Sequence, residues 1–193
     1  MTLPSCRPHP ADPRLVLVAL AVVAAGACGA PAAAGDLPVA HRLQGRVVRV
    51  IDGDTVRLQA ENRRYYTIRL ASIDAPEAGN QPGRPGQPFA QAARRALQAL
   101  VGGATLEAAC YEVDSYGRDI CDLPVRDGTA SQAMVRAGMA WANLQYGGKY
   151  LRDASLTALQ REAGAARRGL WSMPAPVAPW VWRHKCWQLR ECD

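Results

Sequence analysis

Residues 43–58 read LQGRVVRVIDGDTVRL, and this stretch predicts a β-hairpin. Its β-branched residues are dense on both sides of the tripeptide at 52–54, and the Asp-Gly pair within that tripeptide is typical of a tight turn. We therefore expect a first strand over 43–51 and a second strand that begins at Thr55. Alternation of apolar and polar residues within both strands indicates that one face packs on a core.

The chain beyond this hairpin continues as a mixture of strands and helices. A third strand is predicted over 64–73, with Pro76 ending it. Residues 78–88 are rich in Gly and Pro and read as a loop, and such length without regular structure is typical of functional loops. The remaining predicted elements are a helix over 89–100, strands over 105–113 and 120–125, and helices over 131–137 and 150–166. This order predicts an α+β fold, a five-stranded β-barrel of the oligonucleotide-binding (OB-fold) type with three α-helices.

The first 34 residues have the layout of a secretory signal peptide. Two arginines precede an apolar run over 15–25, which is too short to favour a membrane-spanning helix. An Ala-x-Ala site favours cleavage after residue 34, and the alternative is a lipoprotein anchored to a membrane through Cys28. We expect a periplasmic or secreted protein in which residues 35–42 form an N-terminal extension.

Four cysteines remain after the leader, an even number that suits an oxidising compartment. Cys110 and Cys121 lie symmetrically about a turn-like segment, so a hairpin would place them opposite one another. We therefore expect the disulfides Cys110–Cys121 and Cys186–Cys192, the second within a Pro- and Trp-rich tail over 173–193. Free thiols or a zinc site are the alternative, which the lack of a Cys-x-x-Cys pair disfavours.

The formal net charge of +6 favours a polyanionic partner such as nucleic acid. Only two of the 23 basic residues are lysines, however, and such a bias towards arginine also follows from the codon usage of a GC-rich genome. An exported structural domain that binds an anionic polymer would need only this charge. Such a domain would leave the acidic residues described next without a role.

Four acidic residues stand at predicted strand ends and are expected to converge on one rim of the barrel. Asp52 and Asp54 lie in the first turn, Asp74 stands at the end of the third strand, and Glu77 follows three residues later, directly before the loop. Carboxylates are hard oxygen ligands that suit calcium or magnesium. Glu77 could accept or orient a proton of an attacking water. Taken singly, Asp-Gly indicates no more than a turn and Glu77 no more than a solvated acid.

Two arginines accompany these acids. Arg69 lies on the third strand, on the face opposite Ile68 and Leu70, and burying its charge would require a carboxylate or a phosphate. Arg118 follows Gly117 in a turn, and the glycine allows an unusual backbone that projects the side chain. Each arginine alone could be an ordinary surface residue.

Together these residues resemble the staphylococcal nuclease, or thermonuclease, family. The similar segments are VIDGDTV at 50–56, IRLASIDAPE at 68–77, DSYGR at 114–118, MVRAGMA at 134–140 and GLW at 169–171. They occur in the family's order, and the resemblance spans about residues 43–172, which we interpret as a nuclease-like domain.

The resemblance implies a site in which acids hold calcium and arginines bind a phosphate. Its metal ligands would be Asp54, Asp74 and the backbone oxygen of Ala75. Asp52 would be a nearby acid that does not bind the metal directly. Its catalytic residues would be Arg69, Arg118 and Glu77, the last orienting or deprotonating water. The implied reaction is hydrolysis of phosphodiester bonds in DNA and RNA by a monomer, cutting within the chain and leaving 3′-phosphates.

Two departures from the family pattern affect the substrate contacts. Ala75 replaces the usual threonine, which keeps the backbone ligand and loses a hydroxyl. The aromatic pair near the base is only partly kept, so Tyr116 and Tyr146 are expected to contact the substrate, with Trp141 and Tyr146 as core residues in the alternative. The competing function is a noncatalytic nucleic-acid or protein-binding module of the same fold, which would be expected to have lost some of the site side chains.

Overall fold

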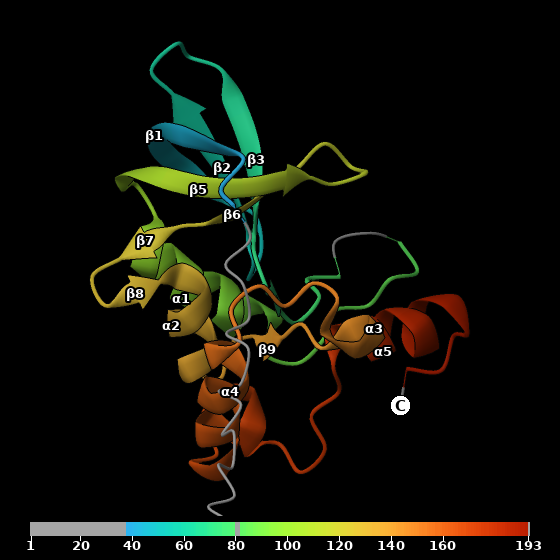
Figure 1. Ribbon diagram of the computed structural model, residues 1–193. Coiled ribbons are helices and arrows are strands. Elements are labelled where there is room, and N and C mark those ends of the chain that lie inside the picture. The colour runs from blue at the N-terminus through green and yellow to red at the C-terminus, as the bar shows by residue number, and fades with distance from the viewer. Residues whose placement is uncertain (1–37, 80–81, 193) are drawn as a thin grey trace, which may run out of the picture. The chain divides into compact units, whose positions relative to one another are not determined.

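Five strands close into a barrel in the computed structural model, which describes residues 38–79 and 82–192 of the chain (Figure 1). In their order around the barrel the strands are β1 (His41–Val50), β2 (Thr55–Ala60), β3 (Tyr65–Leu70), β6 (Asp119–Asp122) and β5 (Thr105–Val113). The predicted α+β fold of the OB type is therefore confirmed. Strand β1 begins at His41, within the predicted N-terminal extension, and the predicted leader lies outside the described residues.

The barrel closes because β3 and β6 pair in parallel while the other neighbours pair antiparallel. Alternate residues of the first three strands fill the interior, each at most 1% exposed: Val47, Val56, Leu58, Ile68 and Leu70. Opposite one another on β5 and β6, Cys110 and Cys121 form one disulfide, and Cys186 and Cys192 form the other. These are the two pairs that the sequence predicts.

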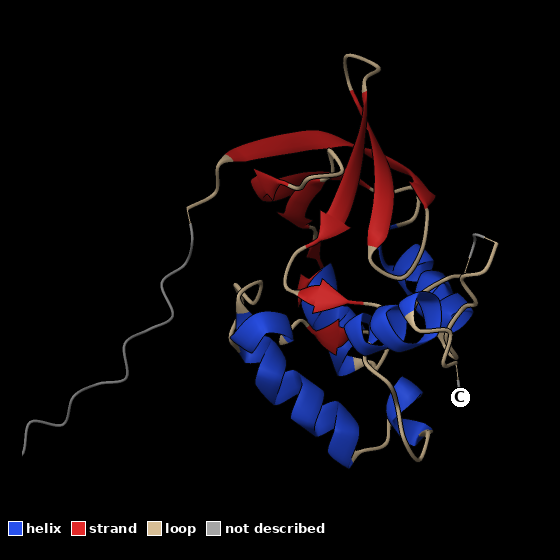
Figure 2. Ribbon diagram, turned by 90° about the vertical axis from the view of Figure 1, so that its right-hand side faces the viewer, coloured by secondary structure: helices blue, strands red, loops and turns tan. Residues whose placement is uncertain are grey.

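The helices gather at one end of the barrel, as Figure 2 shows. The three longer ones correspond to the three predicted helices and are α1 (Ala90–Val101), α2 (Ala130–Arg136) and α4 (Ser155–Ala165). Helix α2 begins with a capping box, in which the Thr129 hydroxyl accepts from the Gln132 backbone and the Gln132 side chain accepts from Thr129 N–H. Helix α1 packs against both α2 and β1, so it covers one end of the barrel core.

Three predicted boundaries differ from the structure. Strand β3 ends at Leu70 because Ser72 adopts a positive φ of 67°, which starts a sharp turn into the two-residue strand β4 (Ile73–Asp74). Helix α4 starts at Ser155 rather than near Tyr150. Residues 124–125 leave β6 to form β7 (Pro124–Val125), which pairs with β8 (Gly128–Thr129) across the predicted Asp-Gly turn.

The chain after residue 168, which includes the tail over 173–193, folds into short helical turns. These are η1 (Gly169–Ser172), α5 (Pro179–Trp182) and the π-helical η2 (Arg183–Gln188), and the remaining short elements are α3 (Gln145–Gly148) and β9 (Trp141–Ala142). The indole N–H groups of Trp182 and Trp187 both donate to the Pro85 carbonyl at 3.0 Å, which fixes the tail on the Gly/Pro-rich loop. Within the described residues, no helix has the length and apolar character needed to cross a membrane.

Candidate active site

The turn between β1 and β2 positions Asp54 at the barrel mouth. The Asp52 side chain accepts a hydrogen bond from the Asp54 N–H at 3.0 Å, and the Ile51 N–H donates to the Thr55 carbonyl at 2.9 Å. The Asp54 carbonyl in turn accepts from the Leu70 N–H at 2.8 Å, which joins the turn to the end of β3. Asp52 thus supports the conformation of the turn, and Asp54 extends into the protein, where it is 3% exposed.

Gly53 allows this turn to lie directly against the segment after β4. A Cβ atom at Gly53 would lie 2.7 Å from the Cβ atoms of both Ala75 and Ala93. Because the backbones approach so closely, the Ala75 N–H donates to Asp54 Oδ2 at 2.8 Å. Ala75, from the segment at 68–77, therefore binds directly to the carboxylate of Asp54, from the segment at 50–56.

Asp74 is brought to the same place by β4, which pairs with β9 and sets Asp74 opposite Trp141. The positive φ of Ser72 turns the chain between β3 and β4, and the Ser72 hydroxyl accepts from the Arg152 N–H at 2.9 Å. The Asn143 N–H donates to the Ser72 carbonyl at 2.8 Å. These bonds hold Asp74 at 1% exposure beside Asp54.

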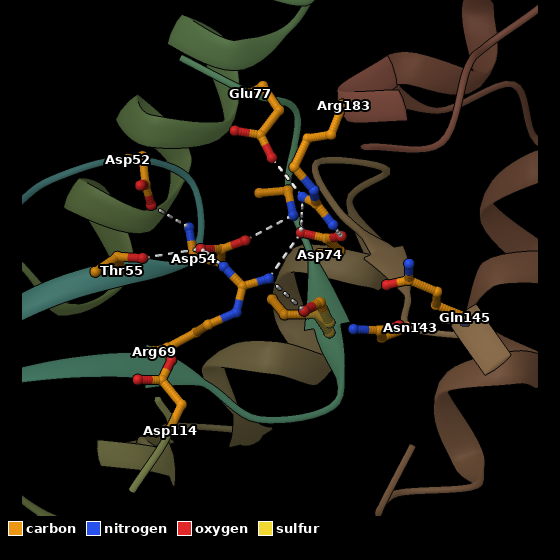
Figure 3. Close-up of polar contacts among 12 residues, drawn as sticks. Asp52, Asp54, Thr55, Arg69, Asp74, Glu77, Asp114, Asn143, Gln145 and Arg183 are labelled. Carbon is orange, nitrogen blue, oxygen red and sulfur yellow. Dashed lines mark hydrogen bonds and ion pairs between the residues drawn. The ribbon is translucent and has the colours of Figure 1, made fainter. Parts of the chain in front are cut away.

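Arg69 joins the two aspartates, as Figure 3 shows. One guanidinium nitrogen lies 2.7 Å from Asp54 Oδ1, and the other lies 2.7 Å from Asp74 Oδ1. Burial lowers the pKa of Arg69, but the facing carboxylates raise it more, so its pKa ends above the ordinary value. The prediction that Arg69 needs an anionic partner is met here by two carboxylates.

The charge on Asp54 is poorly compensated in spite of Arg69. Burial raises the pKa of Asp54 to about 7, with further increases from Asp52 and Asp74, while Arg69 and the Ala75 N–H act in the opposite direction. A carboxylate with a raised pKa favours either a proton or a further cation beside it. The donor set of buried carboxylate oxygens therefore fits a hard divalent cation.

Glu77 faces the same cluster and is bound by a residue that the sequence interpretation missed. One Arg183 nitrogen contacts Glu77 Oε1 and lies 3.2 Å from Asp74 Oδ1, and the other lies 2.8 Å from Asp74 Oδ2. Burial raises the pKa of Glu77, while the hydrogen bond and charge of Arg183 oppose the rise. Figure 3 shows Arg183 approaching the acids from the C-terminal segment, opposite the barrel strands.

Arg118 lies in the same cleft but is bound within its own turn. Its side chain bonds Asp114 Oδ2 at 2.8 Å through Nε and lies 2.7 Å from it through Nη2. Asp114 also accepts from the N–H groups of Tyr116 and Arg118, both at 2.9 Å. Burial raises the pKa of Asp114, but these bonds lower it more, so its pKa is below the ordinary value. Arg118 therefore does not contact the acids that Arg69 joins.

The predicted substrate aromatics are both exposed at the cleft, with Tyr116 at 83% and Tyr146 at 73%. The Arg118 guanidinium lies 5.4 Å from the centre of the Tyr116 ring. Trp141 instead packs edge-on against Trp171, with ring centroids 4.3 Å apart. The core alternative is therefore wrong for Tyr146, and Trp141 is half-buried.

A cleft of about 540 Å³ connects these groups. Its lining includes Asp54, Arg69, Glu77, Tyr116, Arg118 and Arg183. Acids, guanidiniums and exposed rings from distant segments thus share one open space. A phosphate that enters it would meet arginines on several sides.

The carboxylates do not close around one point in this structure. Among the described residues, one set of three ligand atoms lies within 4.8 Å of one another, that of His41, Cys110 and Asp119. The Cys110 sulfur belongs to a disulfide, so this set offers no thiolate. At Asp54, Asp74 and Glu77, guanidinium groups lie between the acids and keep their oxygens apart.

Several known proteins are similar to this chain. A family model described as staphylococcal nuclease homologue matches residues 67–173. A protein of Escherichia coli O157:H7 named uncharacterized endonuclease is 41% identical over 144 residues, which cover 74% of this chain and 86% of that protein. A micrococcal nuclease of Shigella flexneri is 36% identical over 157 residues, which cover 77% and 84% of the two chains. A probable staphylococcal-like nuclease of Oryza sativa subsp. japonica is 33% identical over 120 residues, 62% of this chain and 29% of that one. The region matched by the family model ends before Arg183.

Proposed function

Because the chain belongs to the staphylococcal nuclease family, we propose that it is an exported, calcium-dependent nuclease of the thermonuclease type. Its substrates are DNA and RNA, in which it hydrolyses phosphodiester bonds within the chain and leaves 3′-phosphates. The nuclease domain covers residues 43–172, and the disulfide-closed tail follows it.

The observation that carries this proposal is the meeting of Asp54, Glu77 and Arg69 in one cleft that also contains Arg118. The buried Asp74 joins this group through its ion pair with Arg69. These side chains come from segments up to 64 positions apart in the sequence. A binding module would need the arginines and the exposed rings, but it would gain nothing from burying carboxylates where a phosphate has to enter. The buried acids therefore favour the hydrolase over the noncatalytic alternative.

Asp54, Asp74 and the backbone oxygen of Ala75 would hold the calcium ion, with Asp52 fixing the turn behind them. When bound, calcium supplies Lewis-acid stabilisation of the negative charge that grows on the phosphate oxygens. Calcium suits this site because it accepts several oxygen ligands in flexible geometry. The cation would also compensate the buried charge of Asp54, whose pKa is raised first by burial and further by Asp52 and Asp74.

Glu77 orients the attacking water and accepts its proton at a carboxylate oxygen. As the water oxygen bonds to phosphorus in line, the bond from phosphorus to the 5′ oxygen breaks, and the 5′ oxygen takes up a proton from solvent and leaves as a hydroxyl. Arg69 and Arg118 donate to the non-bridging phosphate oxygens, whose charge is greatest in the transition state. The planar guanidinium suits this task because it can bind two oxygens at once.

A periplasmic or secreted location is proposed from the disulfides and the leader. Both Cys110–Cys121 and Cys186–Cys192 need an oxidising compartment to form and persist. The N-terminal 34 residues would direct export, with membrane attachment only if Cys28 is lipidated. Within this proposal the enzyme is a monomer whose cleft is complete in one chain.

The proposal is tested by incubating the purified protein with end-labelled DNA and RNA, with added calcium or with a chelator. Calcium-dependent cleavage within the strand is expected for both substrates, and Arg69→Ala and Glu77→Ala should each abolish most of it. Treatment of the products with a 3′-phosphatase identifies the phosphate position. Equal cleavage by the wild type and both variants, or cleavage unaffected by the chelator, would contradict the proposed site.

A further inference from the structure

Arg183 belongs to the tail, yet its guanidinium lies between Asp74 and Glu77 (Figure 3). Its two terminal nitrogens contact both Asp74 oxygens and Glu77 Oε1. The Arg183 side chain is 31% exposed, so these ion pairs are partly shielded from water. Burial lowers the pKa of Arg183, but the two acids raise it more, which keeps it charged.

The tail is attached in a way that holds Arg183 in place. Trp182, directly before it, and Trp187 on the next turn both donate to the Pro85 carbonyl, and Arg84 lies 5.3 Å from the centre of the Trp187 ring. Just beyond, the Cys186–Cys192 disulfide closes the end of η2. The guanidinium is therefore delivered by a constrained segment rather than by a free chain end.

The oxygens that Arg183 occupies are those that a divalent cation would need. Asp74 Oδ1 already accepts from Arg69 at 2.7 Å, and Arg183 binds this oxygen as well as Oδ2. A cation that approaches Oδ2 meets the positive charge of Arg183, and one that approaches Oδ1 meets Arg69 as well. Arg69 can keep its bond to Asp54 when a cation enters, whereas every carboxylate bond of Arg183 is to Asp74 or Glu77.

We infer that Arg183 is a further positioning residue of the nuclease site, which acts through Asp74 and Glu77 and which a divalent cation has to displace from Asp74. This inference rests on the proposed calcium-dependent function. In the metal-free protein, Arg183 neutralises the cluster and holds Glu77 beside Asp74. When calcium binds, part of its binding free energy is spent on breaking the Arg183 contacts, so the tail sets the calcium concentration at which the enzyme becomes active.

The test is a calorimetric titration of calcium into the purified wild-type protein and three variants, without substrate. Arg183→Met keeps an unbranched stem but shortens the side chain and removes its charge and donors, and Arg183→Lys keeps the charge. Lys185→Met removes one charge from the same helix at an exposed position and is the matched control. Thermal unfolding of each metal-free variant establishes that it is folded.

Arg183→Met is expected to bind calcium with a Kd roughly tenfold lower than the wild type, equivalent to about 1.4 kcal/mol. Arg183→Lys and Lys185→Met should stay within about threefold of the wild type, equivalent to about 0.6 kcal/mol. In cleavage assays, the calcium concentration for half-maximal activity should fall for Arg183→Met in parallel with its Kd.

An unchanged or weaker calcium affinity in folded Arg183→Met would overturn the inference and leave the nuclease proposal intact, provided that the wild type binds calcium and cleaves. An equal gain in affinity from Lys185→Met would also overturn it, because long-range charge rather than the contacts of Arg183 would then explain the effect. A wild type that cleaves nucleic acid without binding calcium would reject the calcium proposal and this inference together.

Discussion

A methyl group added at Gly53 should disturb the site more than the fold. In Gly53→Ala the new Cβ would lie 2.7 Å from the Cβ atoms of Ala75 and Ala93, roughly 0.8 Å inside the optimal carbon–carbon separation of about 3.5 Å. Relief of two such contacts at a buried position is expected to lower the free energy of unfolding by about 1–3 kcal/mol. The turn and the Ala75 segment have to move apart, which stretches the 2.8 Å bond from Ala75 N–H to Asp54.

Because that bond joins the proposed ligand Asp54 to the segment that bears Asp74, a shift approaching 1 Å should reduce kcat/KM about 100-fold. Urea denaturation gives the stability change, and cleavage of a labelled oligonucleotide gives kcat/KM. Gly164→Ala in helix α4 is the control, since its Cβ would approach nothing closer than the Trp171 ring at 4.0 Å. It should leave kcat/KM near wild type and raise the free energy of unfolding by at most about 1 kcal/mol, because alanine favours the helix. Wild-type stability and activity in Gly53→Ala would refute the close approach on which the site depends.

Three other perturbations test separate parts of the molecule. Arg69→Lys should lower kcat/KM about 100-fold, equivalent to about 3 kcal/mol, because lysine cannot bind two oxygens as a fork; steady-state kinetics with activity close to wild type would contradict this role. Calcium affinity measured by calorimetry should fall as the pH drops below about 7, because a proton then competes for Asp54. The stability of the metal-free protein should show the opposite pH dependence. Because the pKa of Asp54 is raised, its contribution to the free energy of unfolding is complete below about pH 4 and is lost as the pH rises through about 7. Asp54→Asn should remove both dependences, and unchanged pH profiles in that variant would show that another group titrates. Replacing both Cys110 and Cys121 by alanine should cost about 3 kcal/mol in urea denaturation, from the loss of a cross-link that spans 11 positions, and a loss below about 1 kcal/mol would show that the disulfide does not constrain the unfolded chain.

The parts of the site that follow from local pattern were accessible from the sequence. Asp54 lies in a turn signalled by Asp-Gly, and Asp74 follows a strand ended by Pro76, so both were expected at strand ends. The conformation of Ser72 was not accessible, because a positive φ in a residue other than glycine is set by tertiary contacts. The third strand therefore ends at Leu70, three residues before the predicted boundary.

The contacts of Arg118 and Arg183 depend on the folded structure in different ways. Arg118 was predicted to bind phosphate, and in the structure it is held by Asp114, four residues earlier in the same compact turn. For Arg183, the Trp- and Pro-rich composition indicated a packed tail but not the surface on which it packs. That surface is set by bonds of Trp182 and Trp187 to Pro85, about 100 positions away, and no local pattern encodes them.

A crystal structure of the protein grown with calcium would show directly whether Asp54 and Asp74 hold a metal ion. We expect one ion bound by carboxylate oxygens of Asp54 and Asp74 and by the Ala75 carbonyl, at about 2.3–2.6 Å, with Arg183 withdrawn from Asp74. Calcium bound elsewhere, or an acidic cluster that keeps all its guanidinium contacts at saturating calcium, would contradict it.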